Sequence, residues 1–187
     1  MLTDSYSKDL SKKVKSAKRI KMKNGEYIVA SAIFGYCKNE SGKWEPDPEP
    51  AEVVRQIFQM ALDGFTTSQI RDRMCAERRL TPREYTGILS GKEVEPKYMW
   101  STRMIYRMLT NEQYTGCYIS GKHELKEIGS GARRVNDRSD WIVIPGSHPA
   151  IVSKEDFEKT QDMLKNPKEL SPKNLPRAAI AKSCAPA

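Results

Sequence analysis

The residues best suited to binding a ligand are basic and lie near the start of the chain. Residues 8–23 hold eight lysines and arginines against one acidic residue, a net charge of +7, whereas the whole chain of 187 residues carries +8. The basic residues are Lys8, Lys12, Lys13, Lys15, Lys18, Arg19, Lys21 and Lys23. Cations this dense repel one another on a helix, and phosphate groups relieve that repulsion. The segment therefore favours a polyanionic partner such as nucleic acid.

Groups that could carry catalysis or hold a metal are few and scattered. His123 and His148 have no cysteine or carboxylate at metal-ligand spacing, and the acidic residues of 45–49 lie among prolines that precede a helix. The four cysteines are too far apart for a metal ribbon or a disulfide framework: Cys37, Cys75, Cys117 and Cys184. No GxSxG, P-loop or HExxH motif is present. We therefore expect no catalytic residue, no metal site and no cofactor.

The composition predicts one domain of ordinary size with an appended arm. Hydrophobic residues make up 38% of the chain and charged residues 30%. The longest apolar runs fall far short of the ~20 residues that span a membrane, and the first residues hold no apolar signal region. Unpaired cysteines without an export signal indicate reduced thiols in the cytosol, with no membrane partner.

The N-terminal half of the chain predicts an arm, a short β-hairpin and two helices. Leu10, Val14 and Ala17 form a narrow apolar stripe on a basic helix that ends at Asn24-Gly25. Extended segments are expected at 26–30 and 43–45, followed by a stiff connector without regular structure over 46–50. Periodic apolar residues predict a helix over 50–63, and a capping box at Thr66 and Gln69 predicts the next, ending near Glu77.

The C-terminal half predicts two more helices and a pair of strands. After a loop over 81–98, a helix is expected from Ser101 to about Leu109, and a capping box at Ser153 and Asp156 begins the last one. Strands are expected over 114–119 and 141–144. The polar loop between them carries Arg133, Arg134 and Arg138, and it is either a DNA-contacting wing or a disordered hairpin tip. The tail from residue 166 is expected to be poorly ordered.

The helix expected from Ser101 has two chemically different faces. Its inward face is apolar and consists of Trp100, Met104, Ile105, Met108 and Leu109. The other residues are Ser101, Thr102, Arg103, Tyr106 and Arg107. A helix with such a polar face can contact base edges, although many ordinary surface helices look the same.

The order of several short motifs resembles that of the large serine recombinases, the integrases and transposases of phages and mobile elements. The similar segments are Asp9–Lys15, Asn24–Tyr27, Phe34–Tyr36, Pro46–Phe58, Gly64–Ile70, Trp100, Met108–Asn111 with Tyr114–Gly116, and Gly146–Ser153. The family's catalytic domain would precede residue 1, and its zinc ribbon would follow Leu164, where only Cys184 could contribute. The resemblance thus implies a central module alone, with Met1 marking a boundary inside the linker helix.

The resulting prediction is a non-catalytic DNA-binding module of a site-specific recombinase, which would act in DNA integration or excision of a mobile element. We expect an α+β, mainly α fold with a basic arm over 1–25, a helix-turn-helix-like core with small β-hairpins over 26–165, and a tail over 166–187. The partners implied are an attachment or transposon-end half-site in double-stranded DNA and other recombinase subunits, at the nucleoid of a bacterial cytoplasm. The alternative is a protein–protein docking module that pairs through the N-terminal helix.

The predicted DNA contacts fall into three groups. The arm would cross the backbone, the helix from Ser101 would enter the major groove as the second helix of its pair, and the polar loop would reach phosphates. The residues are Lys12, Lys15, Lys18, Arg19 and Lys23 in the arm, Ser101, Thr102, Arg103 and Arg107 in the helix, and Arg133, Arg134 and Arg138 in the loop.

Overall fold

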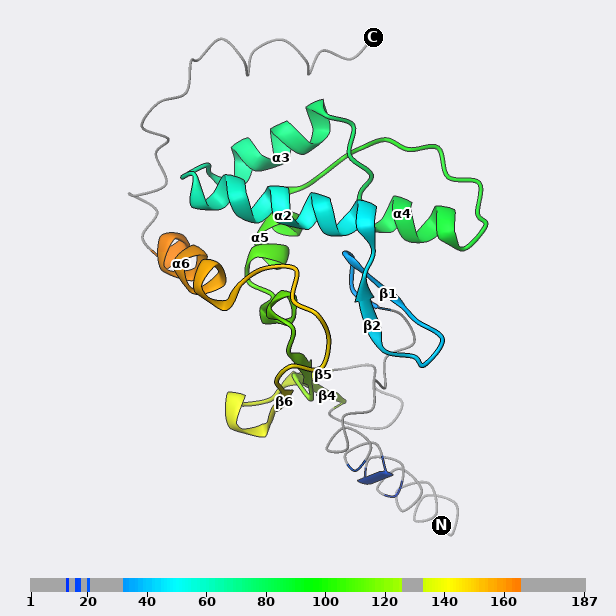
Figure 1. The fold of residues 1–187 in the computed structure, drawn as a ribbon, viewed down its shortest axis with the longest axis vertical. Coiled ribbons are helices and arrows are strands. Elements are labelled where there is room, and N and C mark those ends of the chain that lie inside the picture. The colour runs from blue at the N-terminus through cyan, green and yellow to red at the C-terminus, as the bar shows by residue number, and fades with distance from the viewer. Residues whose placement is uncertain (1–12, 14–15, 18–19, 21–31, 126–132, 166–187) are drawn as a thin grey trace. The chain divides into compact units, whose positions relative to one another are not determined.

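The computed structural model describes residues 13, 16–17, 20, 32–125 and 133–165. Its contacts divide the chain into two units. Of the described residues, the helical unit holds 34–36, 46–111 and 151–165, and the strand unit holds 32–33, 37–45, 112–125 and 133–150 together with those in 13–20. Helices predominate among the described residues and the strands form small two-stranded sheets, so the predicted mainly α, α+β class is confirmed (Figure 1).

Helix α2 (Pro48–Leu62) is the central helix of the helical unit, and α3, α5 and α6 all pack against it (Figure 1). Its predicted inward residues Val54, Ile57 and Phe58 are buried. The helix begins at Pro48, and Pro46 belongs to a strand, so the expectation that 46–50 forms no regular element is wrong. Proline is tolerated in the first helical turn because its missing N–H would have no partner there.

Helix α3 (Thr67–Ala76) begins as predicted, with a capping box. The Thr66 Oγ1 atom accepts a hydrogen bond from the Gln69 N–H at 3.3 Å, and the Gln69 Oε1 atom accepts one from the Thr66 N–H at 2.9 Å. These reciprocal bonds satisfy two of the backbone donors that a helix start leaves open. Ile70 and Met74 are its buried residues, and they anchor it in the core.

Helix α4 (Pro82–Leu89) lies where a loop was expected over 81–98, so that prediction is wrong for its first half. The helix has its own capping box between Thr81 and Glu84, with Pro82 in the first turn. The glycine, proline and charge content of this stretch masked the same start signal that identified α3. Every residue of α4 is at least partly exposed to solvent.

Helices α5 (Thr102–Leu109) and α6 (Lys154–Lys165) match the remaining two helix predictions. The Ser101 hydroxyl caps α5 by accepting a hydrogen bond from the Met104 N–H at 3.2 Å. The Ser153 hydroxyl caps α6 in the same way, by accepting a hydrogen bond from the Asp156 N–H at 3.1 Å. In the helical unit α5 packs against α3, with α4 between them in the sequence.

Short strands pair two by two. Strands β1 (Tyr36–Lys38) and β2 (Trp44–Pro46) form one sheet, close to the expected extended segment at 43–45. In the strand unit, β3 (Tyr118–Ser120) pairs antiparallel with β6 (Ile142–Ile144), and β4 (His123–Leu125) with β5 (Arg133–Val135). Short 3-10 helices precede β3 (η1, Glu112–Thr115) and β6 (η2, Arg138–Asp140).

The strand predicted over 114–119 therefore begins only at Tyr118, because 112–115 forms the 3-10 turn η1. Gly116, at φ +85°, makes the bend between the two elements. The strand expected over 26–30 and the tail from 166 lie outside the described residues. Across the part of the chain that the structure describes, no helix is long and apolar enough to cross a membrane.

Candidate nucleic-acid interface

Helix α5 presents a basic and aromatic surface because its apolar residues face the core. Ile105 and Leu109 are fully buried, whereas Arg103, Tyr106 and Arg107 are exposed. Arg103 and Arg107 lie one turn apart and therefore project from the same side of the helix. Neither guanidinium forms an ion pair or hydrogen bond with any residue that the structure describes. Both predicted contact residues are thus placed where an external anion can reach them.

The chain segment that contains α5 carries charged residues of one sign. Residues 96–111 contain Lys97, Arg103 and Arg107 and no aspartate or glutamate. Unpaired cations on a helix are the side chains that commonly bind DNA phosphates or guanine edges. Thr102 is half-buried, and the Ser101 hydroxyl already accepts the bond from the Met104 N–H. The two arginines are therefore the stronger contact candidates of the four residues predicted on this helix.

Two anchors fix the start of α5 within the helical unit. The buried Trp100 indole donates a hydrogen bond from Nε1 to the Arg79 carbonyl oxygen at 2.8 Å, and its ring packs edge-on against Phe34. The Glu84 Oε1 atom accepts the backbone N–H groups of Lys97 at 2.7 Å and Tyr98 at 3.0 Å. The segment entering α5 is thereby tied to α4 and to the residues that follow α3.

Glu84 makes these bonds as a carboxylate. Its partial burial raises the pKa of the carboxyl group, but hydrogen bonds from the backbone of Thr81 and Lys97 outweigh burial, so the pKa lies below 4.5. Tyr98 adopts φ +53°, a left-handed conformation that costs a non-glycine residue about 1–3 kcal/mol. The bond from the Tyr98 N–H to Glu84 holds that conformation. Sequence reasoning missed Glu84, although the Thr81-x-x-Glu84 capping box was a readable signal.

The arginines on and after α3 serve mainly the fold. Arg71 pairs with Asp72 at 2.6 Å, and both Arg73 and Arg79 pair with Glu77. The Glu77 carboxyl also accepts a bond from the Gln56 amide at 2.8 Å; these contacts outweigh the effect of burial and lower its pKa. Of the five arginines in residues 71–83, Arg78 and Arg83 take no part in these ion pairs. The cluster therefore contributes less free positive charge than its composition indicates.

In the strand unit, the loop arginines are not equivalent. Arg134 lies exposed on β5, whereas Arg138 pairs with Glu112 at 3.0 Å and stacks 5.5 Å from the centre of the Trp141 ring. Lys122 lies 5.0 Å from the same ring centre, and burial lowers its pKa. Because Glu112 neutralises its charge, Arg138 is less suited to binding a DNA phosphate than the basic sequence around it indicates. The pairing of β4 with β5 leaves both interpretations of the loop open, because 126–132 and the Arg133 side chain lie outside the described residues.

Five basic residues of the arm are predicted to contact DNA. Lys12, Lys15, Lys18, Arg19 and Lys23 lie outside the described residues. Within the arm, the structure describes four exposed helical residues: Lys13, Ser16, Ala17 and Ile20.

The histidine, cysteine and carboxylate side chains of the described residues are dispersed. No group of three or more histidine, cysteine, aspartate or glutamate side chains there is placed to hold a metal ion. His148 is buried, and the described cysteines are free thiols, with Cys117 buried and its pKa raised by burial. A cavity of about 430 Å³ is lined by Glu52, Arg55, Gln56, Gln59, Met60 and Arg79.

Comparison with known proteins gives a family and two distant structural likenesses. The family model named Recombinase matches residues 48–167, well over half of the chain. A crystal structure of an LSR–DNA complex is 18% identical, with a TM-score of 0.44, and a structure from work on the Listeria innocua prophage attP site is 16% identical, with a TM-score of 0.46. Each match covers 82% of this chain but 38% and 51% of those chains, respectively.

Proposed function

The chain belongs to the Recombinase family, and from that premise we propose that it is the DNA-binding module of a site-specific serine recombinase. It binds one half of an attachment or transposon-end site in double-stranded DNA. By binding there it positions the parent enzyme, whose subunits carry out integration or excision of a mobile element in a bacterial cytoplasm. The module itself neither cuts nor joins DNA.

The observation that carries this proposal is the exposure of Arg103 and Arg107 on α5, where neither guanidinium pairs with a residue that the structure describes. The helix is anchored by buried Ile105 and Leu109 on one side and bears these cations on the other. A rigid helix with arginines on its free face fits the major groove, where arginine binds the O6 and N7 atoms of guanine. The arm adds a large positive charge that binds phosphates irrespective of sequence.

Titration of the chain with fluorescently labelled duplex DNA tests the proposal. We expect binding in anisotropy measurements at low salt, and a steep loss of affinity at moderate salt because bound phosphates release counterions. Selection from a random-sequence pool is expected to enrich one preferred duplex. The absence of binding at low salt, or equal affinity for every duplex sequence, would refute the proposed sequence-specific function.

A further inference from the structure

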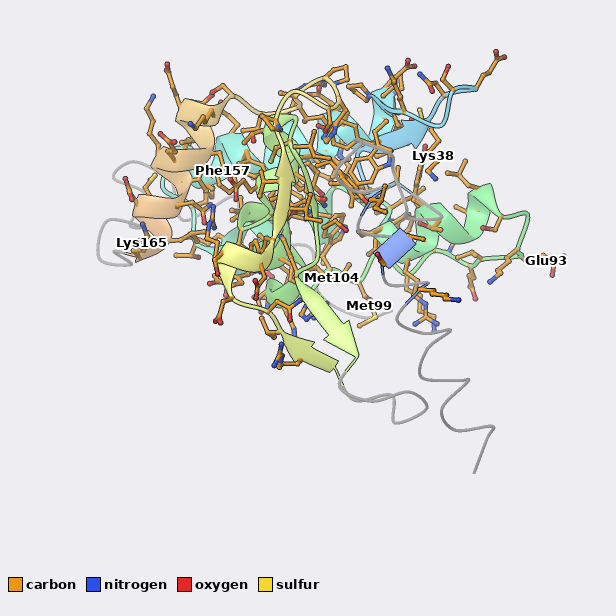
Figure 2. All side chains as sticks on the ribbon, turned by 90° about the horizontal axis from the view of Figure 1, so that it is seen from below. Lys38, Glu93, Met99, Met104, Phe157 and Lys165 are labelled. Atoms are coloured by element: carbon orange, nitrogen blue, oxygen red, sulfur yellow. The ribbon has the colours of Figure 1, made fainter. Side chains whose placement is uncertain are left out.

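Met99 is an apolar side chain held in solvent. Its exposure of 72% is the highest among the large hydrophobic residues that the structure describes. The next residue, Trp100, is buried. Figure 2 labels the side chains of Met99, which precedes α5 in the sequence, and of Met104, which lies within that helix. The chain thus turns one large apolar side chain outward at the start of the candidate DNA-binding helix.

The backbone around Met99 is fixed on both sides. The Tyr98 N–H donates to Glu84 Oε1 at 3.0 Å, and the Trp100 indole donates to the Arg79 carbonyl oxygen at 2.8 Å. Tyr98 adopts φ +53°, which a tyrosine rarely takes without compensating contacts. The exposure of Met99 is therefore imposed by an anchored turn, and strained backbone of this kind is concentrated at binding and switch sites.

The surroundings of Met99 favour an anionic partner over an apolar protein surface. Lys97 precedes it, Arg103 lies in the first turn of the following helix, and residues 96–111 carry no acidic side chain. An apolar group between Lys97 and Arg103 matches the major groove of DNA, and the Glu84 carboxylate that reaches this turn is engaged by the backbone N–H groups of Lys97 and Tyr98. The groove wall consists of phosphates, and its floor presents one apolar substituent, the C5-methyl group of thymine.

We infer that Met99 contacts the C5-methyl group of a thymine in the duplex bound by α5, and so helps to determine which sequence is bound. This inference rests on the proposed function. Residues at the N-terminal end of a recognition helix are those that reach base edges. The thioether side chain is flexible and polarizable, and it adapts to a small apolar surface.

Deoxyuridine provides the test because it differs from thymidine by that methyl group alone. The preferred duplex is first selected from a random pool with the full chain, and its thymines are then replaced one at a time. Removing a buried methyl group is expected to weaken binding about fourfold at one position. The Met99→Ala variant is expected to bind the thymine duplex several-fold more weakly and to lose no further affinity when that thymine becomes deoxyuridine.

Two variants serve as controls. Leu89→Ala removes another apolar side chain, 68% exposed on α4, and is expected to keep the wild-type ratio of thymine to deoxyuridine affinity. Met99→Leu retains an apolar contact and is expected to preserve much of that ratio. Because Met99 is exposed, both Met99 variants are expected to fold normally.

The outcomes separate this inference from the proposed function. Sequence-preferring binding that is insensitive to every deoxyuridine, or a Met99→Ala variant that keeps the full ratio, would overturn the role of Met99 alone. Failure of the wild-type chain to bind any duplex would reject the proposed function and this inference with it. Light scattering of the wild type and of Met99→Ala tests a further outcome. If the wild type self-associates and Met99→Ala is monomeric, Met99 belongs to a contact between copies of the chain and the inference is overturned.

Discussion

The Nε2 atom of His148 lies 2.8 Å from the main-chain carbonyl oxygen of Gln113. A carbonyl oxygen can only accept a hydrogen bond, so Nε2 carries the proton and the neutral ring leaves Nδ1 to accept from the Ser147 hydroxyl, 3.0 Å away. The ring is buried, with its centre 5.1 Å from that of Trp44. His148 is therefore a structural residue that bridges η1 to the segment after β6.

Acidification is expected to destabilise the strand unit through His148. Burial lowers the pKa of His148 below 6.5, although the hydrogen bond to Gln113 partly opposes this. The unfolded chain then binds a proton more readily than the folded one, so the free energy of unfolding falls as the pH drops from 6.5 toward the lower folded pKa. Urea denaturation at pH 7.5, 6.5 and 5.5 measures the effect.

We expect the free energy of unfolding to depend less on pH in His148→Gln than in the wild type. The control His123→Gln, which alters the exposed histidine, is expected to keep the wild-type pH dependence. Equal slopes in wild type and His148→Gln would contradict this role.

Gly116 is expected to tolerate no side chain. It adopts φ +85°, and a Cβ atom there would lie 2.7 Å from the His148 carbonyl oxygen, which belongs to backbone and cannot easily move. We expect Gly116→Ala to lower the free energy of unfolding by about 2 kcal/mol or more, through conformational strain and this overlap. Gly42→Ala is the matched control, because Gly42 has φ +74° but no atom within 4 Å of the position that an alanine Cβ would occupy. Denaturant unfolding of both variants would reveal the overlap as an excess loss in Gly116→Ala; similar losses would show that strain alone acts.

Local signals made most of the helical unit predictable. The capping residues Thr66, Ser101 and Ser153 act within four residues of their partners, so their effect is visible in the sequence. Inward and outward faces of α5 followed from its periodicity, which placed Arg103 and Arg107 correctly on the exposed side. Family membership, too, was predictable from the order of short motifs.

Contacts between distant residues could not be predicted in this way. Arg138 is neutralised by Glu112, which lies 26 residues earlier, and nothing near Arg138 in the sequence announces that pair. Likewise Glu84 reaches the backbone of Lys97 and Tyr98 only because α4 forms and the chain returns to it. Such pairings depend on tertiary structure, and they decide which cations of a basic chain remain available.

Glu84 is expected to position α5 without touching DNA. Glu84→Gln removes the negative charge and substitutes an amide donor for one acceptor oxygen, which weakens the bonds to Thr81, Lys97 and Tyr98. We expect a loss of about 1–3 kcal/mol in the free energy of unfolding. The pKa of Glu84 is lowered in the folded chain, so its ionised carboxylate stabilises the fold above about pH 4.5, and this contribution is lost as the pH falls further. The Glu84→Gln variant lacks this contribution, and its stability is therefore expected to be less sensitive to acid.

Hydrogen exchange of the Lys97 and Tyr98 amides measures the role of Glu84 directly, and faster exchange is expected in Glu84→Gln. The control is Glu93→Gln, which removes the same charge from an exposed residue nearby. Unchanged exchange in Glu84→Gln would show that the negative charge of Glu84 does not protect these two amides.

Arg103 and the arm are expected to contribute different kinds of affinity. Arg103 projects from an anchored helix, so Arg103→Ala is expected to cost about 1–3 kcal/mol on the selected duplex and much less on random DNA, as loss of a base contact does. Lys15→Ala/Arg19→Ala removes two proposed phosphate-binding charges and is expected to weaken binding to all duplexes alike. The slope of log affinity against log salt concentration is expected to become shallower, because roughly two fewer counterions are released on binding. Anisotropy titrations of both variants on both duplexes at several salt concentrations distinguish these effects. Equal losses on selected and random DNA for Arg103→Ala would assign Arg103 to the phosphate backbone, and sequence recognition would then have to come from other side chains of the bound surface.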